Sequence, residues 1–472
     1  MYKYLKKNKN REPDKEIIKH GEKSITNKEL LLKVNQFVNY FNNFPENGKI
    51  LLISEDRFLE TPLIIASIIS GKTISIISNQ TESSIIESIV NIYAPDLIIS
   101  SRMLNYQYIS LNTIYAEVSF HSNVLEYGTE INENSIPLII FTSGSTDVPK
   151  GVQCSWKSIK FCIEEISILI GLNSEDRIGL FLPLFFDYGL YHLFFSIFKN
   201  CSIIFIDKTY IGTNLITDII DNKISILPST PVITQFLINR LKKSNLNSNF
   251  PLKKITNTGE ELDPKAYDKL KEILPNCSIY FMYGVTECKR VAILNPSDFK
   301  FKRGSVGKSL PNVNTWIKDS QGKLHHNNAT GELIVEGPNV MNGYLNEDDS
   351  FYISRGKRFF ATGDIFYKDE HNYLFFKERN KNYIKKNGVR IGLNLLENLY
   401  KNFFSNPELV IEFINNEIVL FIVSNQTIKD LRHIILYNTS PNHKADRVIK
   451  VENIPLLANG KVDRHKIKEM AR

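Results

Sequence analysis

The sequence predicts an α/β protein with a large N-terminal domain of helix-covered, mostly parallel sheets, a small β-rich subdomain and a small α+β C-terminal domain. Two observations predict this class. From about residue 48, short runs of β-branched residues alternate with longer segments of helical spacing, which is typical of parallel sheets covered by helices. After about residue 300 the runs are separated by Gly, Pro and Asn turns, which indicates a smaller β-rich region.

The alternating pattern divides into individual elements. Strands are expected at residues 49–54, 73–78, 96–100, 137–143, 177–183, 201–207, 224–230 and 253–259. Two of the intervening segments, residues 156–172 and 263–275, have clear helical spacing. The β-rich region adds short strands near residues 304–312, 331–337 and 372–378.

A polar, basic segment containing a glycine, residues 375–392, separates two apolar regions and predicts a linker at about Lys381. We therefore expect one domain over residues 1–380 and a second over residues 381–472. The second domain is expected to contain, in order, a helix at 393–404, strands at 408–414 and 417–423, a helix at 427–438 and a strand at 446–455. This order is typical of a small α+β domain.

The bulk composition excludes several classes of protein. The 472 residues are 42% hydrophobic and 23% charged, which is ordinary for a globular protein of two or more domains. The net charge of +7 is spread along the chain, so no nucleic-acid partner is expected. Apolar stretches are broken well short of the roughly 20 residues of a membrane helix, and no secretory signal is recognisable. These two observations predict no membrane partner, and five cysteines without CxxC spacing favour a reduced, cytoplasmic protein.

The stretch FTSGSTDVPKGV, residues 141–152, follows one expected strand directly. Its approachable backbone N–H groups, its hydroxyls and Lys150 make the kind of cradle that holds a polyphosphate. The Walker pattern GxxxxGK[ST] cannot be read here, which disfavours a P-loop kinase or GTPase. Taken alone, the stretch has an alternative interpretation as an ordinary hydroxyl-rich loop.

Further motifs follow in order: YFMYGVTECKR at residues 280–290, ATGDIFY at 361–367, and NGKVDR at 459–464, with Arg379 and IKKNGVRI in the linker. This set resembles the adenylate-forming superfamily, which includes acyl-CoA synthetases, luciferases and the adenylation domains of peptide synthetases. The resemblance covers nearly the whole chain, from about residue 12 to residue 465. Each motif alone has an ordinary explanation as a turn or a surface ion pair, but their combination is specific.

The resemblance implies an ATP site and a role for each matching residue. The β- and γ-phosphates would be wrapped by Thr142, Ser143, Gly144, Ser145, Thr146 and Lys150. The adenine would lie against Gly259, Glu260, Tyr283 and Gly284. Thr286 would contact the α-phosphate, and Glu287 would bind Mg²⁺. Asp364 would accept both ribose hydroxyls with help from Arg379, and Lys461 on the mobile C-terminal domain would reach the substrate carboxylate and the α-phosphate.

The implied chemistry needs no general base, because the nucleophile is a carboxylate that is already ionised at pH 7. Repulsion between this anion and the triphosphate must be overcome, and cations and N–H donors do this at several kcal/mol each. The chain departs from the family pattern at Asp147 and Glu378, where relatives usually have Gly. We expect Asp147 to point to solvent, and Glu378 leaves Arg379 intact but puts the linker geometry in doubt.

The resemblance also implies a second half-reaction, transfer of the acyl group to a phosphopantetheine thiol. The C-terminal domain would rotate about Lys381, withdraw Lys461 and bring IKKNGVRIG to the site. The basic residues Lys385, Lys386 and Arg390 would meet the phosphopantetheine phosphate, or are simply a solvated charged loop. No carrier domain follows Arg464, so the expected acceptor is a separate carrier protein, with CoA as the alternative.

The identity of the acid depends on the residues expected to line its pocket: Asp187, Tyr188, Tyr191, Leu227, Thr256, Thr258, Met282, Arg290 and Val291. In amino-acid-adenylating relatives, an aspartate matching Asp187 pairs with the substrate ammonium, so an amino acid is favoured over a plain acyl or aryl acid. Arg290 has two interpretations: it binds an acidic side chain, or it pairs with Asp187 or Glu287 and is structural. A catalytically inactive relative is disfavoured because the catalytic lysines, Glu287 and both ribose-contacting residues are all present.

Overall fold

The computed structural model describes residues 1–119, 131–142, 149–207, 214–243, 250–258, 262–345, 351–354, 357–379, 383–386, 389–404, 408–415, 417–439, 444–457 and 462–471. The chain divides into two compact units: Met1–Asn314 with Val335–Phe360, here called unit 1, and Thr315–Ile334 with Ala361–Arg472, here called unit 2. The boundaries fall inside strands β16 (Asn314–Lys318), β18 (Ala329–Glu336) and β21 (Lys357–Lys368). The expected domain boundary at residue 381 stays a prediction.

Unit 1 contains a sheet with the order β19-β8-β7-β4-β3-β5-β6 in its described part. Its strands are β3 (Lys49–Ile53), β4 (Thr73–Ile77), β5 (Leu97–Ser100), β6 (Ile109–Ser110), β7 (Leu138–Thr142), β8 (Lys150–Cys154) and β19 (Gly343–Tyr344). The strands from β7 to β6 run parallel, and β8 and β19 add antiparallel pairs at one edge. The central strands β3 and β5 are apolar and buried almost throughout, as expected for strands covered on both faces.

A second sheet of unit 1 has the order β15-β14-β13-β12-β11-β9-β10-β1-β2 over the described residues. Its strands are β1 (Glu16–His20), β2 (Lys23–Thr26), β9 (Arg177–Leu180), β10 (Ser202–Phe205), β11 (Ile226–Ser229), β12 (Lys254–Asn257), β13 (Ser278–Tyr283), β14 (Ala292–Leu294) and β15 (Lys308–Ser309). The six strands from β1 to β13 are parallel, and the two ends of the sheet are antiparallel. The prediction of mostly parallel sheets is therefore confirmed.

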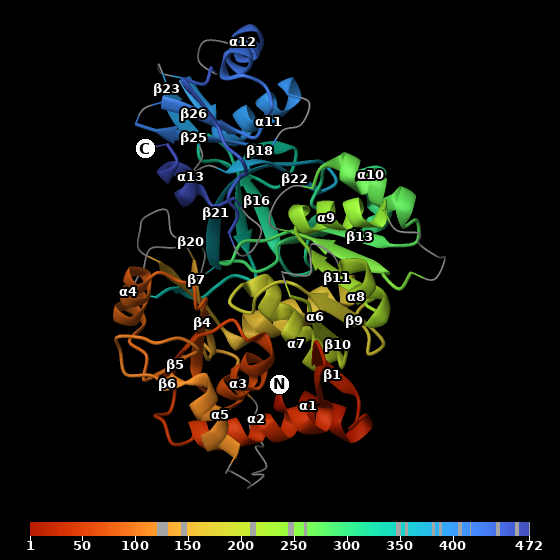
Figure 1. Cartoon of the computed structure of the whole chain (residues 1–472), viewed down its shortest axis with the longest axis vertical. Helices are drawn as coiled ribbons and strands as arrows, with labels where there is room; N and C mark the ends of the chain where they lie inside the picture. Colours follow the sequence, from red (N-terminus) through yellow and green to blue (C-terminus); the bar gives the residue numbers. More distant parts are fainter. Residues whose placement is uncertain are drawn as a thin grey trace. The chain divides into compact units, whose positions relative to one another are not determined.

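The helices of unit 1 alternate with these strands. They are α1 (Tyr2–Arg11), α2 (Asn27–Phe41), α3 (Arg57–Ile69), α4 (Ser83–Tyr93), α5 (Leu111–Ser119), α6 (Trp156–Leu169), α7 (Asp187–Lys199), α8 (Leu215–Asp221), α9 (Pro231–Leu241) and α10 (Pro264–Ile273), with a 3-10 turn at Pro296–Asp298. Side-chain caps fix several helix starts: a Thr26–Glu29 capping box begins α2, and Ser155 caps α6. In Figure 1, α8, α9 and α10 lie beside strands β9 to β13 and cover that part of the sheet.

Unit 2 combines a β-rich part with a small α+β part. In the first, the described strands have the order β17-β16-β18-β21, with β22 (Leu374–Arg379) also on β21, and β17 spans Leu324–His325. β21 continues into unit 1, where it pairs with β20 (Tyr352–Ser354). In the second part, the strands are β23 (Tyr383–Lys386), β24 (Val389–Gly392), β25 (Leu409–Ile414), β26 (Glu417–Ile422) and β27 (Arg447–Lys450). Helices α11 (Leu393–Phe403), α12 (Ile428–Asn438) and α13 (Arg464–Glu469) complete it, so the predicted α+β order is confirmed.

The five cysteines are all free and buried. Burial raises the pKa of the Cys162, Cys201 and Cys277 thiols to about 12, so these side chains stay neutral and serve as small apolar groups of the core. As for membrane crossing, the helices within the described ranges are all too short or too polar to span a bilayer.

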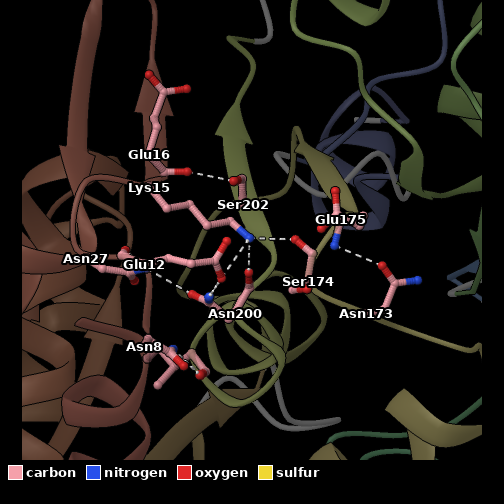
Figure 2. Close-up of polar contacts among 11 residues, drawn as sticks. Asn8, Glu12, Lys15, Glu16, Asn27, Asn173, Ser174, Glu175, Asn200 and Ser202 are labelled. Carbon is pink, nitrogen blue, oxygen red and sulfur yellow. Dashed lines mark hydrogen bonds and ion pairs between the residues drawn. The ribbon is translucent and has the colours of Figure 1, made fainter. Parts of the chain in front are cut away.

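A partly buried polar cluster attaches the N-terminal elements to the end of α7 (Figure 2). We call it the N-terminal seam, and its members are Asn8, Glu12, Lys15, Asn27 and Asn200. The Lys15 ammonium donates to the carbonyls of Ser174 (2.6 Å) and Asn200 (2.7 Å). The Asn27 amide donates to the Glu12 carbonyl (2.9 Å) and to Asn200 Oδ1 (3.1 Å), and the Asn200 amide donates to Glu12 Oε2 (2.5 Å). Asn200 ends α7 in the left-handed conformation (φ 57°), which Asn adopts more readily than most residues.

Candidate active site

Several predicted site residues lie outside the described residues. These are Ser143, Gly144, Ser145 and Thr146 of the hydroxyl-rich loop, with Asp147, and also Gly259, Glu260, Lys381 and Lys461. Their assigned roles stay predictions. The described backbone includes Arg379 on β22 and the basic linker residues on β23 and β24.

The two ends of the hydroxyl-rich loop are held together by the sheet. Thr142 is the last residue of β7, Lys150 is the first of β8, and the two are antiparallel partners. The Thr142 hydroxyl also donates to the Lys150 carbonyl at 3.5 Å. The loop is therefore the connection of a β-hairpin, and its two ends leave the sheet side by side.

Lys150 lies close to two other polar groups of unit 1. Its ammonium is 5.0 Å from the centroid of the Tyr344 ring, and the Tyr344 hydroxyl donates to Glu287 Oε1 at 2.7 Å. Tyr344 reaches this place because β19 pairs with β8. The structure thus brings Lys150 and Glu287 to one tyrosine, which the sequence analysis did not single out because Tyr344 carries no motif and lies 57 residues from Glu287.

The segment after β13 forms a tight turn. The Val291 amide donates back to the Tyr283 carbonyl, and the Cys288 amide donates to the Val285 carbonyl, both at 2.9 Å. Gly284 is required here, because a Cβ atom at this position would lie 2.0 Å from the Lys289 carbonyl oxygen. Tyr283 is buried, whereas Thr286 and Glu287 are partly exposed at the tip of the turn.

The same turn is fixed from outside by Asn339 and Met341, which the sequence analysis also missed. The Asn339 amide donates to the carbonyls of Cys288 and Arg290, each at 2.9 Å, and Asn339 is fully buried. The Met341 backbone amide donates to the Glu287 carbonyl at 2.7 Å. Three successive contacts therefore set the path of residues 287–290.

A narrow cavity lies between α6, α7, β12, β13 and this turn. It is lined by Ile166, Ile170, Asp187, Tyr188, Tyr191, His192, Phe195, Thr256, Met282, Lys289 and Arg290. Six of the residues predicted to line the acid pocket are among them: Asp187, Tyr188, Tyr191, Thr256, Met282 and Arg290. Leu227, Thr258 and Val291 are buried nearby but do not line the cavity. Lys289 and His192 were not singled out from the sequence, because nothing in it indicates that a lysine in a polar turn points inward.

Hydrogen bonds fix one side of the cavity. The Tyr188 hydroxyl interacts with the backbone carbonyl (2.8 Å) and hydroxyl (2.6 Å) of Thr256. Arg290 Nη1 donates to the Thr258 hydroxyl at 2.7 Å, and that hydroxyl donates to the Met282 carbonyl at 3.2 Å. The Arg290 guanidinium carbon is 5.2 Å from the centroid of the Tyr188 ring, within the range of a cation–π contact.

Other polar atoms of the cavity have no hydrogen-bond partner among the described residues. They are the Tyr191 hydroxyl, Lys289 Nζ and Arg290 Nε, all buried. Arg290 forms no ion pair with Asp187 or Glu287 in the described part of the chain, so the pairing expected of a structural Arg290 is not observed. Asp187 lies in the first turn of α7, where its Oδ1 accepts from the Tyr188 amide at 2.7 Å and where the helix dipole favours an acid.

Burial determines the charge of His192, which also lines the cavity. His192 is 2% exposed, and burial lowers the pKa of its imidazole to about 4 despite a hydrogen bond to the Tyr188 carbonyl at 2.6 Å. His192 is therefore neutral at pH 7. Because a carbonyl only accepts, the Nδ1 atom carries the imidazole proton.

Unit 2 holds the predicted ribose-binding residues. Asp364 and Arg379 are register partners on β21 and β22, and Asp364 is buried. The Asp364 amide donates to the Thr362 hydroxyl at 3.2 Å, and this hydroxyl donates to the Leu333 carbonyl at 2.9 Å. Gly363 between them has φ 71°, a conformation that favours glycine. Glu378, the departure from the family pattern, lies opposite Ile365 in the same pair of strands.

Comparisons with known proteins identify relatives of this arrangement. The family described as "AMP-binding enzyme" matches residues 5–345. The chain is 26% identical over 359 residues to 4-coumarate–CoA ligase-like 4 of Oryza sativa, covering 72% of this chain but only 64% of that protein. It is 25% identical over 485 residues to 2-succinylbenzoate–CoA ligase of Oceanobacillus iheyensis, covering 98% of both. It is also 25% identical to surfactin synthase subunit 2 of Bacillus subtilis over 96% of this chain and 13% of that protein.

Solved structures share the fold. The o-succinylbenzoate–CoA synthetase MenE of Bacillus subtilis, in complex with its acyl-adenylate intermediate, matches with a TM-score of 0.84 at 17% identity, over 98% of this chain and 97% of that chain. MenE has also been solved with ATP and a magnesium ion. VinN in complex with L-aspartate matches with a TM-score of 0.71 at 22% identity, over 80% of this chain and 97% of that chain. The predicted fold class is therefore confirmed.

Proposed function

The chain belongs to the AMP-binding enzyme family, and we propose that it is an AMP-forming acid–thiol ligase. In the first step, a substrate carboxylate attacks the α-phosphorus of ATP, so that an acyl-adenylate forms and pyrophosphate leaves. In the second step, a thiol attacks the acyl carbon, so that a thioester forms and AMP leaves. The observation that carries the proposal is the convergence of Lys150 and Glu287 on Tyr344, beside the cavity beneath the turn after β13.

ATP and Mg²⁺ are the proposed co-substrate and cofactor, as in the MenE complex. Thr142 and Lys150, with the hydroxyl-rich loop between them, are proposed to hold the phosphates, and Asp364 with Arg379 the ribose. Glu287 fits a magnesium site of the usual kind, in which one or two carboxylates and the substrate phosphates hold the ion. Bound there, Mg²⁺ would neutralise charge that develops on the phosphates.

The acid is proposed to enter the narrow cavity with its reacting carboxylate toward the nucleotide. Asp187 is the candidate partner for a substrate ammonium, which supports an amino acid as substrate, and VinN with its bound L-aspartate gives that choice a precedent of the same fold. An acid without an amine stays the second candidate, because Asp187 also has a structural role as the N-terminal acid of α7.

The acceptor thiol is proposed to be that of CoA. A relative that matches over 98% of both chains is a CoA ligase, and this supports the CoA alternative better than transfer to a separate carrier protein, which the sequence analysis put first. Transfer to a carrier protein is the second candidate, favoured by the match of surfactin synthase subunit 2 over nearly the whole chain.

The test is acid-dependent ATP–pyrophosphate exchange by the purified protein, followed by detection of the thioester. The panel contains the common amino acids together with fatty, aryl and dicarboxylic acids. Exchange with an acid and formation of its CoA thioester would support the proposal in full. Exchange with a thioester formed only on a phosphopantetheinylated carrier protein would overturn the CoA assignment, and silence across the panel would overturn adenylation.

A further inference from the structure

Two consecutive residues, Lys289 and Arg290, line the narrow cavity between α6, α7, β12 and β13, and both are buried. We call this cavity the acid cavity, because the substrate acid is proposed to enter it. Consecutive side chains of an extended segment point to opposite sides, so this arrangement needs a break in the backbone. Lys289 supplies it, with φ at 55° in the left-handed region. Backbone strain at a residue other than glycine persists only where its surroundings enforce it, and such strain gathers at ligand sites.

The donors that this turn carries into the cavity are not used. Lys289 Nζ has three donor positions and, apart from the weakly accepting sulfur of Cys154, no acceptor among the described residues. Arg290 uses Nη1 on Thr258 but leaves Nε without a partner. The Tyr191 hydroxyl, on the α7 side of the cavity, also lacks a partner. Lys289 Nζ lies 6.0 Å from the centroid of the Tyr191 ring, so the two groups border the same space. Buried donors without acceptors are rare, and several in one cavity require an explanation.

The charges around the cavity do not balance. Lys289 and Arg290 are two cations, and Asp187 is the acidic residue that lines the cavity with them. His192 is neutral at pH 7, and burial raises the pKa of the Cys154 thiol near Lys289, so neither supplies a negative charge. Among the residues that line the cavity, the cations therefore outnumber the acids by one.

We propose that the acid activated by this enzyme carries a second carboxylate, remote from the reacting one, and that Lys289, Arg290 and Tyr191 bind it. This inference rests on the proposed ligase function. A carboxylate offers only acceptors, which match an ammonium, a guanidinium N–H and a phenol hydroxyl. The volume of the cavity that is open to the centre of a water-sized sphere is about 20 Å³, which is little more than one water molecule needs. The cavity therefore admits a small terminal group and no long chain. An ordered water molecule is the alternative occupant, but it would leave the charge unbalanced.

The experiment compares matched acids. Each dicarboxylic acid, with and without an α-amino group, is paired with its half-amide and with the monocarboxylic acid of the same length, and kcat/KM for pyrophosphate exchange is measured for all three. Wild-type enzyme should prefer the dicarboxylic acid by roughly 100-fold or more, because the half-amide and the monocarboxylic acid leave a buried charge unpaired. Binding of each acid is measured in parallel from the shift in Tm that it causes.

The variant is Lys289→Met, which keeps an unbranched side chain, one atom shorter than lysine, and removes its charge. The preference for the dicarboxylic acid should fall by at least about tenfold. The matched control is Lys15→Met, in the N-terminal seam, which should leave the preference unchanged. A ratio of two acids does not depend on how much enzyme is folded, so loss of stability in either variant does not disturb the comparison.

The possible outcomes test the binding of a second carboxylate separately from the proposed ligase function. Two results would contradict the proposed binding of a second carboxylate while supporting the ligase function. In the first, some acid supports exchange but dicarboxylic acids have no advantage. In the second, the advantage of dicarboxylic acids survives in Lys289→Met. If no acid supports exchange, yet dicarboxylic acids raise the Tm of wild type and not of Lys289→Met, the carboxylate site stands and the ligase function is wrong. If neither exchange nor a Tm shift is seen with any dicarboxylic acid, both are wrong.

Discussion

Two sequestered lysines of unit 1, Lys15 and Lys289, have opposite surroundings. The Lys15 ammonium donates to two backbone carbonyls at 2.6 and 2.7 Å and lies 3.9 Å from the Glu12 carboxylate (Figure 2). Lys289 is more deeply buried, and its ammonium has no hydrogen-bond partner in the described part of the chain. One lysine completes a network, and the other leaves a network incomplete.

The difference extends to the neighbours of each lysine. Within the described residues, no buried side-chain atom of the N-terminal seam lacks a partner, whereas the acid cavity contains three such atoms. A satisfied polar cluster stabilises the connection between elements, because breaking any of its bonds leaves a buried group unpaired. An unsatisfied cluster in a cavity costs stability in the free protein and is therefore a better sign of a ligand than polarity alone.

The largest expected effect concerns a third lysine, Lys461, proposed to bridge the substrate carboxylate and the α-phosphate. Lys461→Ala should slow adenylate formation by about 10³-fold or more, because a charge placed where the transition state gathers charge is removed. ATP binding should change little. Pyrophosphate exchange and a separate ATP titration measure the two quantities, and near-normal exchange would show that the lysine has no catalytic role.

The next effect tests the comparison directly by removing each charge in turn. Lys15→Met should lower the free energy of unfolding by about 3 kcal/mol, since two carbonyls and Glu12 lose a charged donor. Lys289→Met should change the stability of the free protein by less than about 1 kcal/mol, since the penalty for burying the ammonium and its attraction to Asp187 disappear together. Calorimetry of both variants without ligand measures the shifts. Equal losses in the two variants would break the comparison.

A smaller expected effect is the pH dependence of stability caused by His192 in the acid cavity. The pKa of His192 is about 4 in the folded protein and about 6.5 when unfolded, so the unfolded state binds more protons between these values. The stabilising contribution of neutral His192 is thus present above pH 6.5 and lost as pH falls toward 4. Between pH 7.5 and 5, wild type should lose about 2 kcal/mol more stability than His192→Gln. Parallel pH-dependent unfolding curves that do not diverge in this window would contradict the assignment.

The smallest expected effect concerns Asn200 in the N-terminal seam. Asn200→Gly keeps the left-handed end of α7 and removes the amide bonds to Glu12 and Asn27, so stability should fall by about 1 kcal/mol. Asn200→Ala should cost about 1 kcal/mol more, because alanine is strained in that conformation. Thermal unfolding of the two variants separates the contribution of the backbone from that of the amide. Identical losses would show that the backbone conformation contributes nothing.

The parallel sheets could be predicted because their strands are continuous apolar runs, such as residues 49–54, where burial on both faces leaves a clear signal. The N-terminal helix α1 could not be predicted in this way. Its sequence, YKYLKKNKNR, is mostly polar, and it is held by contacts from distant residues. Asn8 donates to the Ile197 carbonyl at 2.8 Å, and Tyr4 stacks on Phe198 with ring centroids 4.3 Å apart.

The candidate site shows the same limit. Asp187, Tyr188, Tyr191 and Arg290 could be placed in one pocket because they follow recognisable motifs. Lys289 could not, since its inward direction depends on a left-handed backbone conformation that its own residue type does not favour. Asn339 and Tyr344 were missed for another reason: they reach the turn from a segment about 50 residues away, through contacts that no local pattern records.

The left-handed turn at Lys289 also has an evolutionary consequence. Because it directs two adjacent side chains into one cavity, two neighbouring codons encode both cations at that end of the pocket. In pockets whose determinants are scattered over separate elements, a change of substrate requires mutations at distant positions. Here, Asn339 and Gly284 preserve the path of the chain. A duplicated gene can therefore come to encode an enzyme for a different acid through mutations confined to one short stretch of DNA.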